Sequence, residues 1–359
     1  MRQTAAPGGA PQGAPSRREL RAALAPLAKP DTAIALAWLT GDALVWLALT
    51  AVTASEVAWG WKLLAGLAAG LWIARLFIIG HDACHQALTA HRKLNRVLGR
   101  IAFLPSCTPY SLWELGHNQA HHGFTNLRGR DGVWVPLSAE EYAALPAHRR
   151  ALERAYRSGW GPGLYYAVEL WWKKLYFPRP EQGGGQRPLF ARDGALVTAF
   201  AFTWVGALWV GATVAGTSVL QALFFGLLLP VLVWKHLMGF VIYVHHTEPD
   251  VAWYDDGAAW AASLPYLGAT LHLQAPLLDA LLHRILQHPA HHLDMTIPFY
   301  RLRAAQQSLR ALAPQHVQAR QLTWAYYWQV ARQCKLYDYR QQKWCSFPAP
   351  VRRARGVEA

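Results

Sequence analysis

The chain has 359 residues, of which 53% are hydrophobic and 16% charged, and it contains 18 tryptophans. Because this composition is too apolar and aromatic for an ordinary soluble domain, we expect a membrane protein. The formal net charge of +14 does not indicate a nucleic-acid partner, since the basic residues lie between hydrophobic segments and form no RNA- or DNA-reading motif.

The chain is expected to hold one domain, residues 31–345, between two tails. The first residues, "MRQTAAPGGAPQGAPS", are rich in Pro, Gly and Ala and lack the apolar region of a signal peptide, so 1–30 is predicted to be a disordered tail. Residues 346–359 form the predicted C-terminal tail. The cysteines lack paired C-x-x-C spacing and are expected to stay reduced; they are Cys84, Cys107, Cys334 and Cys345.

Two apolar segments follow the N-terminal tail, at about 33–55 and 57–80, and each is long enough to cross a bilayer. The first contains Asp42, and the second contains Lys62 and Arg75. Lys62 is expected to snorkel toward the outer surface, and Arg75 lies toward the opposite end. A structural polar pair is the simplest explanation for Asp42, although the sequence does not name its partner.

A second pair of spans is predicted at about 195–214 and 218–243. No Asp, Glu, Lys or Arg occurs between Gly194 and Trp234, and the two spans are joined at "AGTS". Pro230 is a candidate kink in the second span. The sequence therefore predicts an all-α integral membrane protein with four transmembrane helices in two hairpins.

The distribution of positive charge predicts how these hairpins are oriented. Nearly all of the 35 Lys and Arg residues fall in 1–31, 81–195 and 245–359. By the positive-inside rule, we expect a bacterial inner-membrane protein whose termini and inter-hairpin segment lie in the cytoplasm, with a cytoplasmic helical cap. Between the hairpins, "GLYYAVELWWKKLYFPRP" (163–180) predicts either a helix in the membrane interface or an amphipathic helix packed on the protein.

Half of the 16 histidines fall into three short clusters on the predicted cytoplasmic side. The clusters read "HDACH", "HNQAHH" and "HPAHH", and their histidines are His81, His85, His117, His121, His122, His288, His291 and His292. Adjacent histidines on a helix point about 100° apart, so one ion cannot easily use both. The pattern therefore indicates two metal ions side by side.

The residue types narrow the kind of metal site without fixing the metal. Imidazole suits Fe, Zn, Cu or Ni, and eight clustered imidazoles are too many for one structural zinc. The zinc-protease motif H-E-x-x-H is absent. A ferritin-like site would need two E-x-x-H motifs, and only Glu114 to His117 fits.

The three clusters read H-x3-H, H-x3-H-H and H-x2-H-H, and their flanking text includes "TPYSLWELGHNQAHHGFTN", "MGFVIYVHHTEPDVAWYDD" and "HPAHHLDMTIPFYRL". In these boxes, and in their spacing around two hairpins, the chain resembles the membrane fatty acid desaturase family, in particular its acyl-lipid, omega-6-like bacterial branch. The resemblance extends from about residue 33 to 310.

The resemblance implies a di-iron centre that uses O2 to place a cis double bond in a fatty acyl chain. It adds a ligand from "HHTEP", where the family often reads Q-H-T-H-P: His246 matches the ligand, while His245 stands where Gln is usual. The implied ligands are His81, His85, His117, His121, His122, His246, His288, His291 and His292. We expect His245, and the carboxylates Asp82 and Asp294, to orient ligands or a water.

The family also implies partners. The substrate is a fatty acyl chain linked to a lipid, to CoA or to a carrier protein, within membrane lipid. The sequence contains neither an H-P-G-G haem signature nor a G-x-G-x-x-G loop, so electrons are expected from a separate donor such as a ferredoxin or a cytochrome b5 type protein. Four arginines either attract that donor or serve topology and anionic lipid; they are Arg149, Arg150, Arg154 and Arg157.

Three other residue groups and three other functions are left open. Candidate tunnel residues are Trp113, Tyr110 and Trp253. Solvent or packing roles are expected for His91, His148, His272 and His316, while the roles of His236 and His283 are undecided. The same scaffold also serves lipid hydroxylases, epoxidases and acetylenases, and a haem-bearing membrane electron carrier or a transporter with a histidine-rich loop are alternatives of other classes.

Overall fold

The computed structural model describes residues 14–178 and 188–348, and most of them are helical. The first helices are α1 (Arg17–Leu24), α2 (Thr32–Ala54), α3 (Trp59–Cys84), α4 (Arg92–Phe103), α5 (Tyr110–Leu115), α6 (Ala139–Ala144), α7 (Ala147–Tyr156) and α8 (Pro162–Tyr165). The others are α9 (Pro188–Val214), α10 (Val219–Leu223), α11 (Leu229–His246), α12 (Gly257–Ala262), α13 (Pro265–Gly268), α14 (Pro276–Leu281), α15 (His288–Leu293), α16 (Leu302–Leu312) and α17 (Trp324–Gln333).

Short irregular helices and four short strands complete the described part of the chain. The 3₁₀ segments are Ala25–Ala28, Leu104–Ser106 and Phe299–Arg301, and the π-helical segments are Gly116–His121, Tyr166–Tyr176 and Phe224–Leu228. β1 (His272–Gln274) pairs in parallel with β2 (Ala319–Gln321), and β3 (Leu336–Asp338) pairs antiparallel with β4 (Lys343–Cys345). The all-α expectation therefore missed two small sheets.

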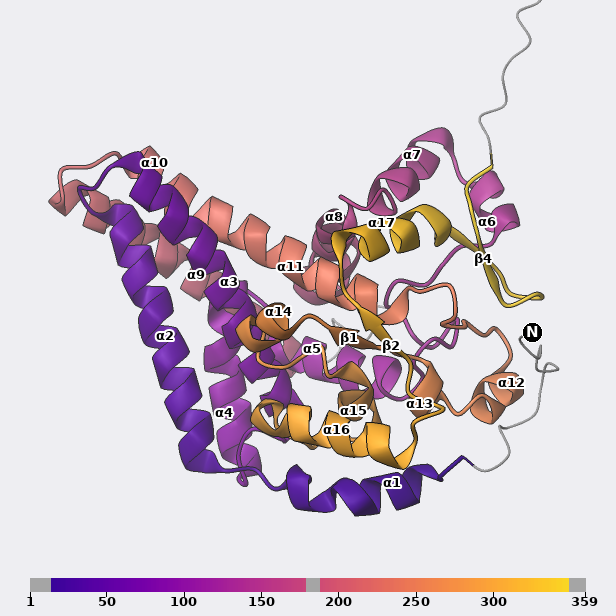
Figure 1. Ribbon diagram of the computed structural model, residues 1–359. Coiled ribbons are helices and arrows are strands. Elements are labelled where there is room, and N and C mark those ends of the chain that lie inside the picture. The colour runs from indigo at the N-terminus through magenta and orange to yellow at the C-terminus, as the bar shows by residue number, and fades with distance from the viewer. Residues whose placement is uncertain (1–13, 179–187, 349–359) are drawn as a thin grey trace, which may run out of the picture.

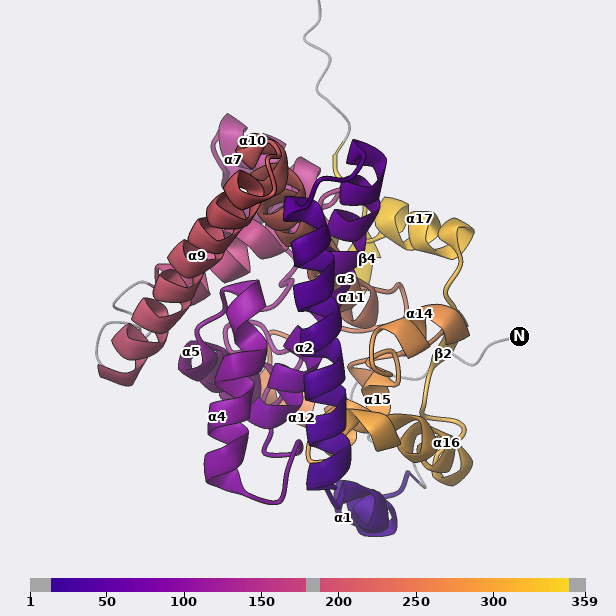
Figure 2. The same cartoon turned by 90° about the vertical axis from the view of Figure 1, so that its left-hand side faces the viewer.

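Within the described residues, four helices are long and apolar enough to cross a membrane: α2, α3, α9 and the continuous helix Val219–His246, which comprises α10, a π-helical turn and α11. The expected spans fall on these helices. Figure 1 shows α2, α9 and much of α11 extending to the left, with α6, α7, α12 and α17 at the right, and Figure 2 shows α2 and α9 in front when the molecule is seen from the left-hand side. Both α3 and α11 continue beyond the predicted ends of their spans, to Cys84 and His246.

Close packing of α3 against Val219–His246 depends on glycine. A Cβ at Gly66 would lie 2.4 Å from the carbonyl oxygen of Phe225, and one at Gly70 would lie 2.5 Å from Cβ of Val233. Small residues four apart allow two helix backbones to approach closely, where dispersion contacts can stabilise a helix pair in lipid. The two helices that carry His81 and His246 are thus held against each other.

The charged residues in the first pair of long helices have partners. Asp42 Oδ1 accepts a hydrogen bond from Arg75 Nε at 2.8 Å, and Asp42 Oδ2 lies 2.5 Å from His283 Nε2. This is the polar pair that the sequence left without a named partner. Lys62 does not snorkel to the surface as expected, because it is 1% exposed and its Nζ donates to Thr217 Oγ1 at 2.6 Å.

The N-terminal region departs from the expected disordered tail within its described part. Ser16 and Glu19 form a capping box at the start of α1, and Leu20 and Leu24 are buried, with α1 packing on α15 and α16. An N-cap with an apolar stripe is sufficient to dock a short helix. The Pro- and Gly-rich segment 1–13 lies outside the described residues, as do 349–359 of the C-terminal tail.

The segment expected at 163–180 is helical from Pro162 to Tyr176 and packs on α11. Trp171 Nε1 donates to the carbonyl of Cys107 at 3.0 Å, whereas the side chains of Trp172 and Phe177 are exposed. One face therefore packs on protein, and the other presents aromatic side chains outward. The cysteines are free thiols, as predicted.

Candidate metal centre and adjoining cavity

The predicted ligands lie where helices end. His81 occupies the last turn of α3, with His85 directly after it, and His246 is the last residue of α11. The second cluster lies on and just after the π-helical segment Gly116–His121, and the third lies on α15. Four separate parts of the chain therefore bring their imidazoles to one place.

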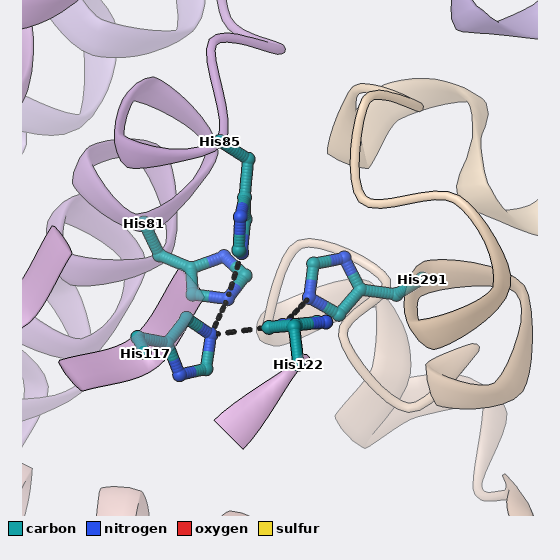
Figure 3. A group of neighbouring side chains, drawn as sticks. All are labelled: His81, His85, His117, His122 and His291. Carbon is teal, nitrogen blue, oxygen red and sulfur yellow. Dashed lines mark hydrogen bonds between the residues drawn. The ribbon is translucent and has the colours of Figure 1, made fainter. Parts of the chain in front are cut away.

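The nine histidines form two groups, and within each group one ring nitrogen per residue lies within 4.8 Å of every other. The first group, shown in Figure 3, contains His81, His85, His117, His122 and His291. The second contains His121, His246, His288 and His292. No predicted ligand lies outside these two groups.

The spacing of the Nε2 atoms matches ligands of a shared cation. In the first group, His117 Nε2 lies 2.8 Å from His81 Nε2 and 3.1 Å from His122 Nε2. In the second, His288 Nε2 lies 3.2 Å from His246 Nε2 and 3.0 Å from His292 Nε2. Two nitrogens at about 2.1 Å from one ion and 90° apart are separated by about 3.0 Å.

Hydrogen bonds between the rings cannot account for all of these contacts. The Nε2 atom of a neutral imidazole either donates one proton or accepts one. His81 Nε2 lies close to both His117 and His85, at 2.8 and 3.1 Å, and His122 Nε2 lies 3.1 Å from both His117 and His291. Along this row of Nε2 atoms, hydrogen bonds can form only at every second contact. One cation bound by all of the Nε2 atoms would explain every contact.

A π-helical turn divides the second cluster between the groups. The N–H of His122 donates to the carbonyl of His117, five residues earlier, at 3.0 Å. This wider turn places His117 and His122 in the same group, although residues five apart would diverge on an α-helix. His121, four residues after His117, instead belongs to the other group.

Burial favours the neutral form of six of these imidazoles. The pKa values of His85, His117, His122, His288 and His291 are lowered well below the usual value, first because burial disfavours the charged form and then because neighbouring histidines repel it. The pKa of His292 is lowered for the same reasons. A neutral ring retains the lone pair that metal binding requires.

In His121 and His292, a contact with a neighbouring side chain fixes which ring nitrogen carries the proton. Both carboxylate oxygens of Asp131 lie 3.2 Å from His121 Nδ1, and an ionised carboxylate only accepts. Thr125 Oγ1 donates to the carbonyl of His121 at 2.7 Å, so it accepts from His292 Nδ1 at 3.2 Å. In both cases the proton is held on Nδ1 and Nε2 is left free to bind.

Of the carboxylates expected to orient ligands, only one lies beside a ligand ring. Asp82 Oδ1 is 3.4 Å from His81 Nδ1. Asp294 instead forms an ion pair with Arg21, 3.1 Å away, and accepts from Thr296, so it anchors α1 and orients no histidine. Sequence reasoning missed Asp131 and Thr125, although both follow the second histidine cluster directly in "HHGFTNLRGRD".

The remaining histidines lie outside the two groups. His245 stacks on His288 with centroids 3.9 Å apart, and neither of its ring nitrogens has a hydrogen-bond partner. His236 lies against the backbone of Gly163, away from both groups. His283 binds Asp42. The roles expected for the others fit their positions: His91 and His148 are exposed, His316 is half-buried, and His272 is buried in β1.

A cavity of about 640 Å³ adjoins both histidine groups. Its lining includes His81 and His117 of the first group and His121, His246 and His288 of the second, with His245 beside them. Most other lining side chains are apolar, namely Phe77, Ile78, Leu112, Trp113, Leu115, Val133, Leu170, Leu175, Met238, Val241, Ile242 and Ile285. A largely apolar cavity with imidazoles in its lining suits a hydrocarbon chain.

Only one of the three expected tunnel residues lines this cavity. Trp113 does, whereas Tyr110 and Trp253 are buried in other contacts. The Tyr110 hydroxyl donates to the carbonyl of Ala83 at 3.1 Å, and Trp253 Nε1 donates to the carbonyl of His246 at 3.4 Å. Both therefore support the helix ends that carry ligands.

Each of the four arginines expected either to attract a donor or to serve topology has a contact within the protein. Arg149 and Arg157 pair with Glu169 and Glu153, and Arg157 is buried. Arg150 donates to the carbonyl of Leu145, and the exposed Arg154 donates to the hydroxyl of Tyr142.

Comparison with known proteins identifies the family. A family model described as fatty acid desaturase matches residues 57–324, which is more than half of the chain and includes all nine clustered histidines. The chain belongs to the fatty acid desaturase family. Members of this family are oxidoreductases, so the chain is an enzyme of that class, as the resemblance predicted.

The relatives of this desaturase come from cyanobacteria and plants. It is 32% identical over 270 residues to an sn-1 oleoyl-lipid 12-desaturase of Synechocystis, covering 75% of this chain and 74% of the relative. It is 30% identical over 287 residues to an sn-1 oleoyl-lipid 12-desaturase of Picosynechococcus, covering 75% of each. It is also 30% identical to a chloroplastic omega-6 fatty acid desaturase of spinach, covering 79% of this chain and 59% of the relative.

Proposed function

We propose that this desaturase introduces a cis double bond into the acyl chain of a membrane lipid, using O2 and two iron ions held by the two histidine groups. The observation that carries the proposal is the convergence of nine imidazoles, eight buried and one half-buried, in groups of five and four, beside a largely apolar cavity that five of them line. The names of the relatives support an oleoyl chain on a lipid as the substrate and position 12 as the site of the new bond.

The donor set and its surroundings fit iron. All nine ligands are imidazoles, and neutral imidazole binds iron among other transition metals. Two iron ions, when bound, supply the reduction of O2 and the removal of one hydrogen from each of two adjacent carbons. Buried nitrogens without protein partners, such as Nδ1 of His85 and His288, leave room for further hydrogen bonds around the site.

The residues around the site position the acyl chain and exclude water. The imidazoles hold the metal ions, and Asp131 and Thr125 keep protons on Nδ1 of His121 and His292. The aromatic and aliphatic lining, including Phe77 and Trp113, admits hydrocarbon and keeps the reacting carbons away from water. The chemistry needs no nucleophilic side chain, and none of the proposed roles requires one.

The four long helices are proposed to form two membrane hairpins, with the histidine groups and both termini on the cytoplasmic side of an inner membrane. The position of the basic residues supports this orientation. The apolar side chains that α2 and α9 leave exposed support a lipid-facing surface; they include Leu44, Leu47, Phe202, Trp209 and Val210. The exposed Trp172 and Phe177 support an interfacial position for the helix Pro162–Tyr176.

The arrangement disfavours a haem carrier. A haem iron takes at most two axial protein ligands, whereas five and four imidazoles converge here. Hydroxylation, epoxidation and acetylenic-bond formation would use the same metal centre. The chemical structure of the product distinguishes these reactions from desaturation, because each leaves a different group on the acyl chain.

The decisive experiment is analysis of the fatty acids of a bacterial host that expresses this chain together with a ferredoxin and its reductase. Gas chromatography with mass spectrometry should show a new unsaturated acid with wild-type protein and none with His121→Ala. His91→Ala, which changes an exposed histidine outside both groups, is the control and should retain the product. A hydroxylated or acetylenic product, or product formation by His121→Ala, would contradict the proposal.

A further inference from the structure

A surface groove of about 900 Å³ lies over the metal centre and is separate from the acyl cavity. Helix α1 lines one side, the segment after α15 another, and a third part of the lining comes from within and just after the second histidine cluster. The lining includes Arg17, Arg18, Arg21, Asn118, His122 and Asp294. Figure 1 shows α1 lying along the lower edge of the molecule, beneath α15 and α16.

His122 connects this groove with both histidine groups. It is a member of the first group, and its ring stacks on that of His292 in the second, with centroids 4.3 Å apart and planes 21° apart. It is also 8% exposed and lines the groove, whereas it does not line the acyl cavity. An electron arriving at the base of the groove is therefore within one imidazole of either proposed metal site.

The wall formed by α1 is positively charged and firmly attached. Arg17 donates to the carbonyls of His292 and Leu293 at 3.4 Å, and Arg21 pairs with Asp294. Arg18 is exposed, and no acidic partner for it occurs among residues 14–178 and 188–348. A positive wall beside a redox centre attracts a negatively charged partner and orients it during encounter.

We propose that a soluble, acidic one-electron carrier protein docks on this groove, against α1, and delivers electrons through His122. The inference rests on the proposed function, since desaturation needs an external reductant. Reduction of O2 to two waters takes four electrons: two come from the pair of C–H bonds that are broken. The other two come from two successive reduced carriers, and two protons come from solvent.

The contact surface differs from the one that the sequence pointed to. Arg149, Arg150, Arg154 and Arg157 do not line the groove over the histidine groups. Arg18 remains available for a partner and lies on the same wall that contacts the backbone of His292 through Arg17. The position of α1 over the metal ligands, in addition to its charge, favours this site for a redox partner.

The test compares Arg18→Glu with Arg332→Glu in purified, iron-loaded enzyme. Both residues are exposed arginines on short helices, and Figure 1 shows that α17, which carries Arg332, lies at the opposite edge from α1. Reduced plant-type ferredoxin, a small acidic protein, is the probe. At low salt, Arg18→Glu should lower the second-order rate of ferredoxin oxidation by roughly threefold to tenfold, and salt should diminish the difference.

Two further measurements keep the outcomes distinct. With dithionite and methyl viologen in place of ferredoxin, wild type and both variants should desaturate equally; failure of wild type here would refute the proposed function and not the docking site. Equal ferredoxin rates for Arg18→Glu and Arg332→Glu would refute the docking site alone. A loss by Arg18→Glu that occurs in phosphatidylglycerol vesicles but not in phosphatidylcholine vesicles would show that lipid occupies the groove, which also overturns the proposal.

Discussion

At the scale of single residues, the histidine pattern located the nine imidazoles that converge, whereas the side chains that orient two of them were not visible in it. Histidines at helical spacing are distinctive, and all nine converge. Asp131 is one carboxylate among many in the sequence, and only the turn from Asn126 to Val133 brings it to His121. Its carboxylate also accepts hydrogen bonds from the backbone N–H groups of Asn126 and Val133. Tertiary contacts of this kind leave no periodic signal.

Replacing Asp131 with Asn tests its role in orienting His121. An amide keeps the shape but has a single oxygen, so it can accept from only one of the two backbone N–H groups that Asp131 binds, and it lacks the negative charge that holds the proton on His121 Nδ1. We expect iron affinity to fall roughly tenfold to a hundredfold, together with some loss of stability at this turn. Metal analysis after dialysis and the yield of unsaturated acid would measure this. The control, Asp255→Asn, changes an exposed carboxylate and should retain both the iron and the unsaturated product. Unchanged iron content in Asp131→Asn would show that Asp131 is not needed to orient His121.

A buried histidine away from the metal groups should make folding sensitive to acid. Burial, and then Arg310, lower the pKa of His272 to about 4. Since the unfolded chain takes up this proton near pH 6.5, the contribution of His272 is fully present above that pH and is lost as the pH falls toward 4. The slope is at most about 1.4 kcal/mol per pH unit.

Thermal unfolding of the detergent-solubilised protein at pH 7.5 and 5.0 would reveal this dependence. His272→Gln should reduce the fall in melting temperature between the two pH values, whereas His148→Gln, which changes an exposed histidine, serves as the control. The same fall in all three proteins would show that His272 does not contribute to the acid sensitivity.

At the scale of helices, hydropathy located the four long elements, while their exact ends and contacts were determined by features that hydropathy does not record. In the sequence, the apolar runs end where the polar histidines begin, yet α3 and α11 remain helical through His81 and His246. The capping box at Ser16 was a local signal for α1, obscured by the Pro- and Gly-rich residues before it. The π-helical turn at Gly116–His121 had no sequence signature that separated it from an α-helix.

The glycine contact between α3 and Val219–His246 gives a prediction at this scale. In Gly70→Ala the new Cβ would lie 2.5 Å from Val233 Cβ and 2.8 Å from the carbonyl of Pro230. Either the helices separate or side chains shift, so we expect a loss of about 1–3 kcal/mol in stability and weaker iron binding. Gly60→Ala, on the same helix with nothing within 4 Å, should be neutral or slightly stabilising.

Thermal unfolding and iron content, measured on both variants in the same detergent, would separate these outcomes. A Gly70→Ala protein as stable as Gly60→Ala would mean that the α3 contact tolerates a wider spacing than the structure has. Retention of iron together with lower stability would mean that the ends of α3 and α11 stay aligned even when their middle parts are pushed apart.

At the scale of the whole molecule, one buried polar cluster joins the long helices to the segment that carries α15. Asp42 on α2 contacts Arg75 on α3 and His283, and Arg75 also donates to the carbonyl of Leu281 at 2.8 Å. His283 and Arg284 both have positive φ, at 49° and 64°, a conformation that costs non-glycine residues free energy. The contact with Asp42 therefore holds a strained turn just before His288, one of the proposed ligands.

Removal of Asp42 should disturb both stability and the metal centre. Asp42→Ala leaves the buried charge of Arg75 without its carboxylate, which typically costs about 3–5 kcal/mol, and frees His283 from its anchor. Asp42→Ala combined with Arg75→Met removes both charges, so most of the stability should return. The turn at His283 stays unanchored in the double variant, however, and iron content should remain below that of wild type. Recovery of stability and iron together would show that the cluster only balances charge; recovery of stability alone would show that it also positions α15.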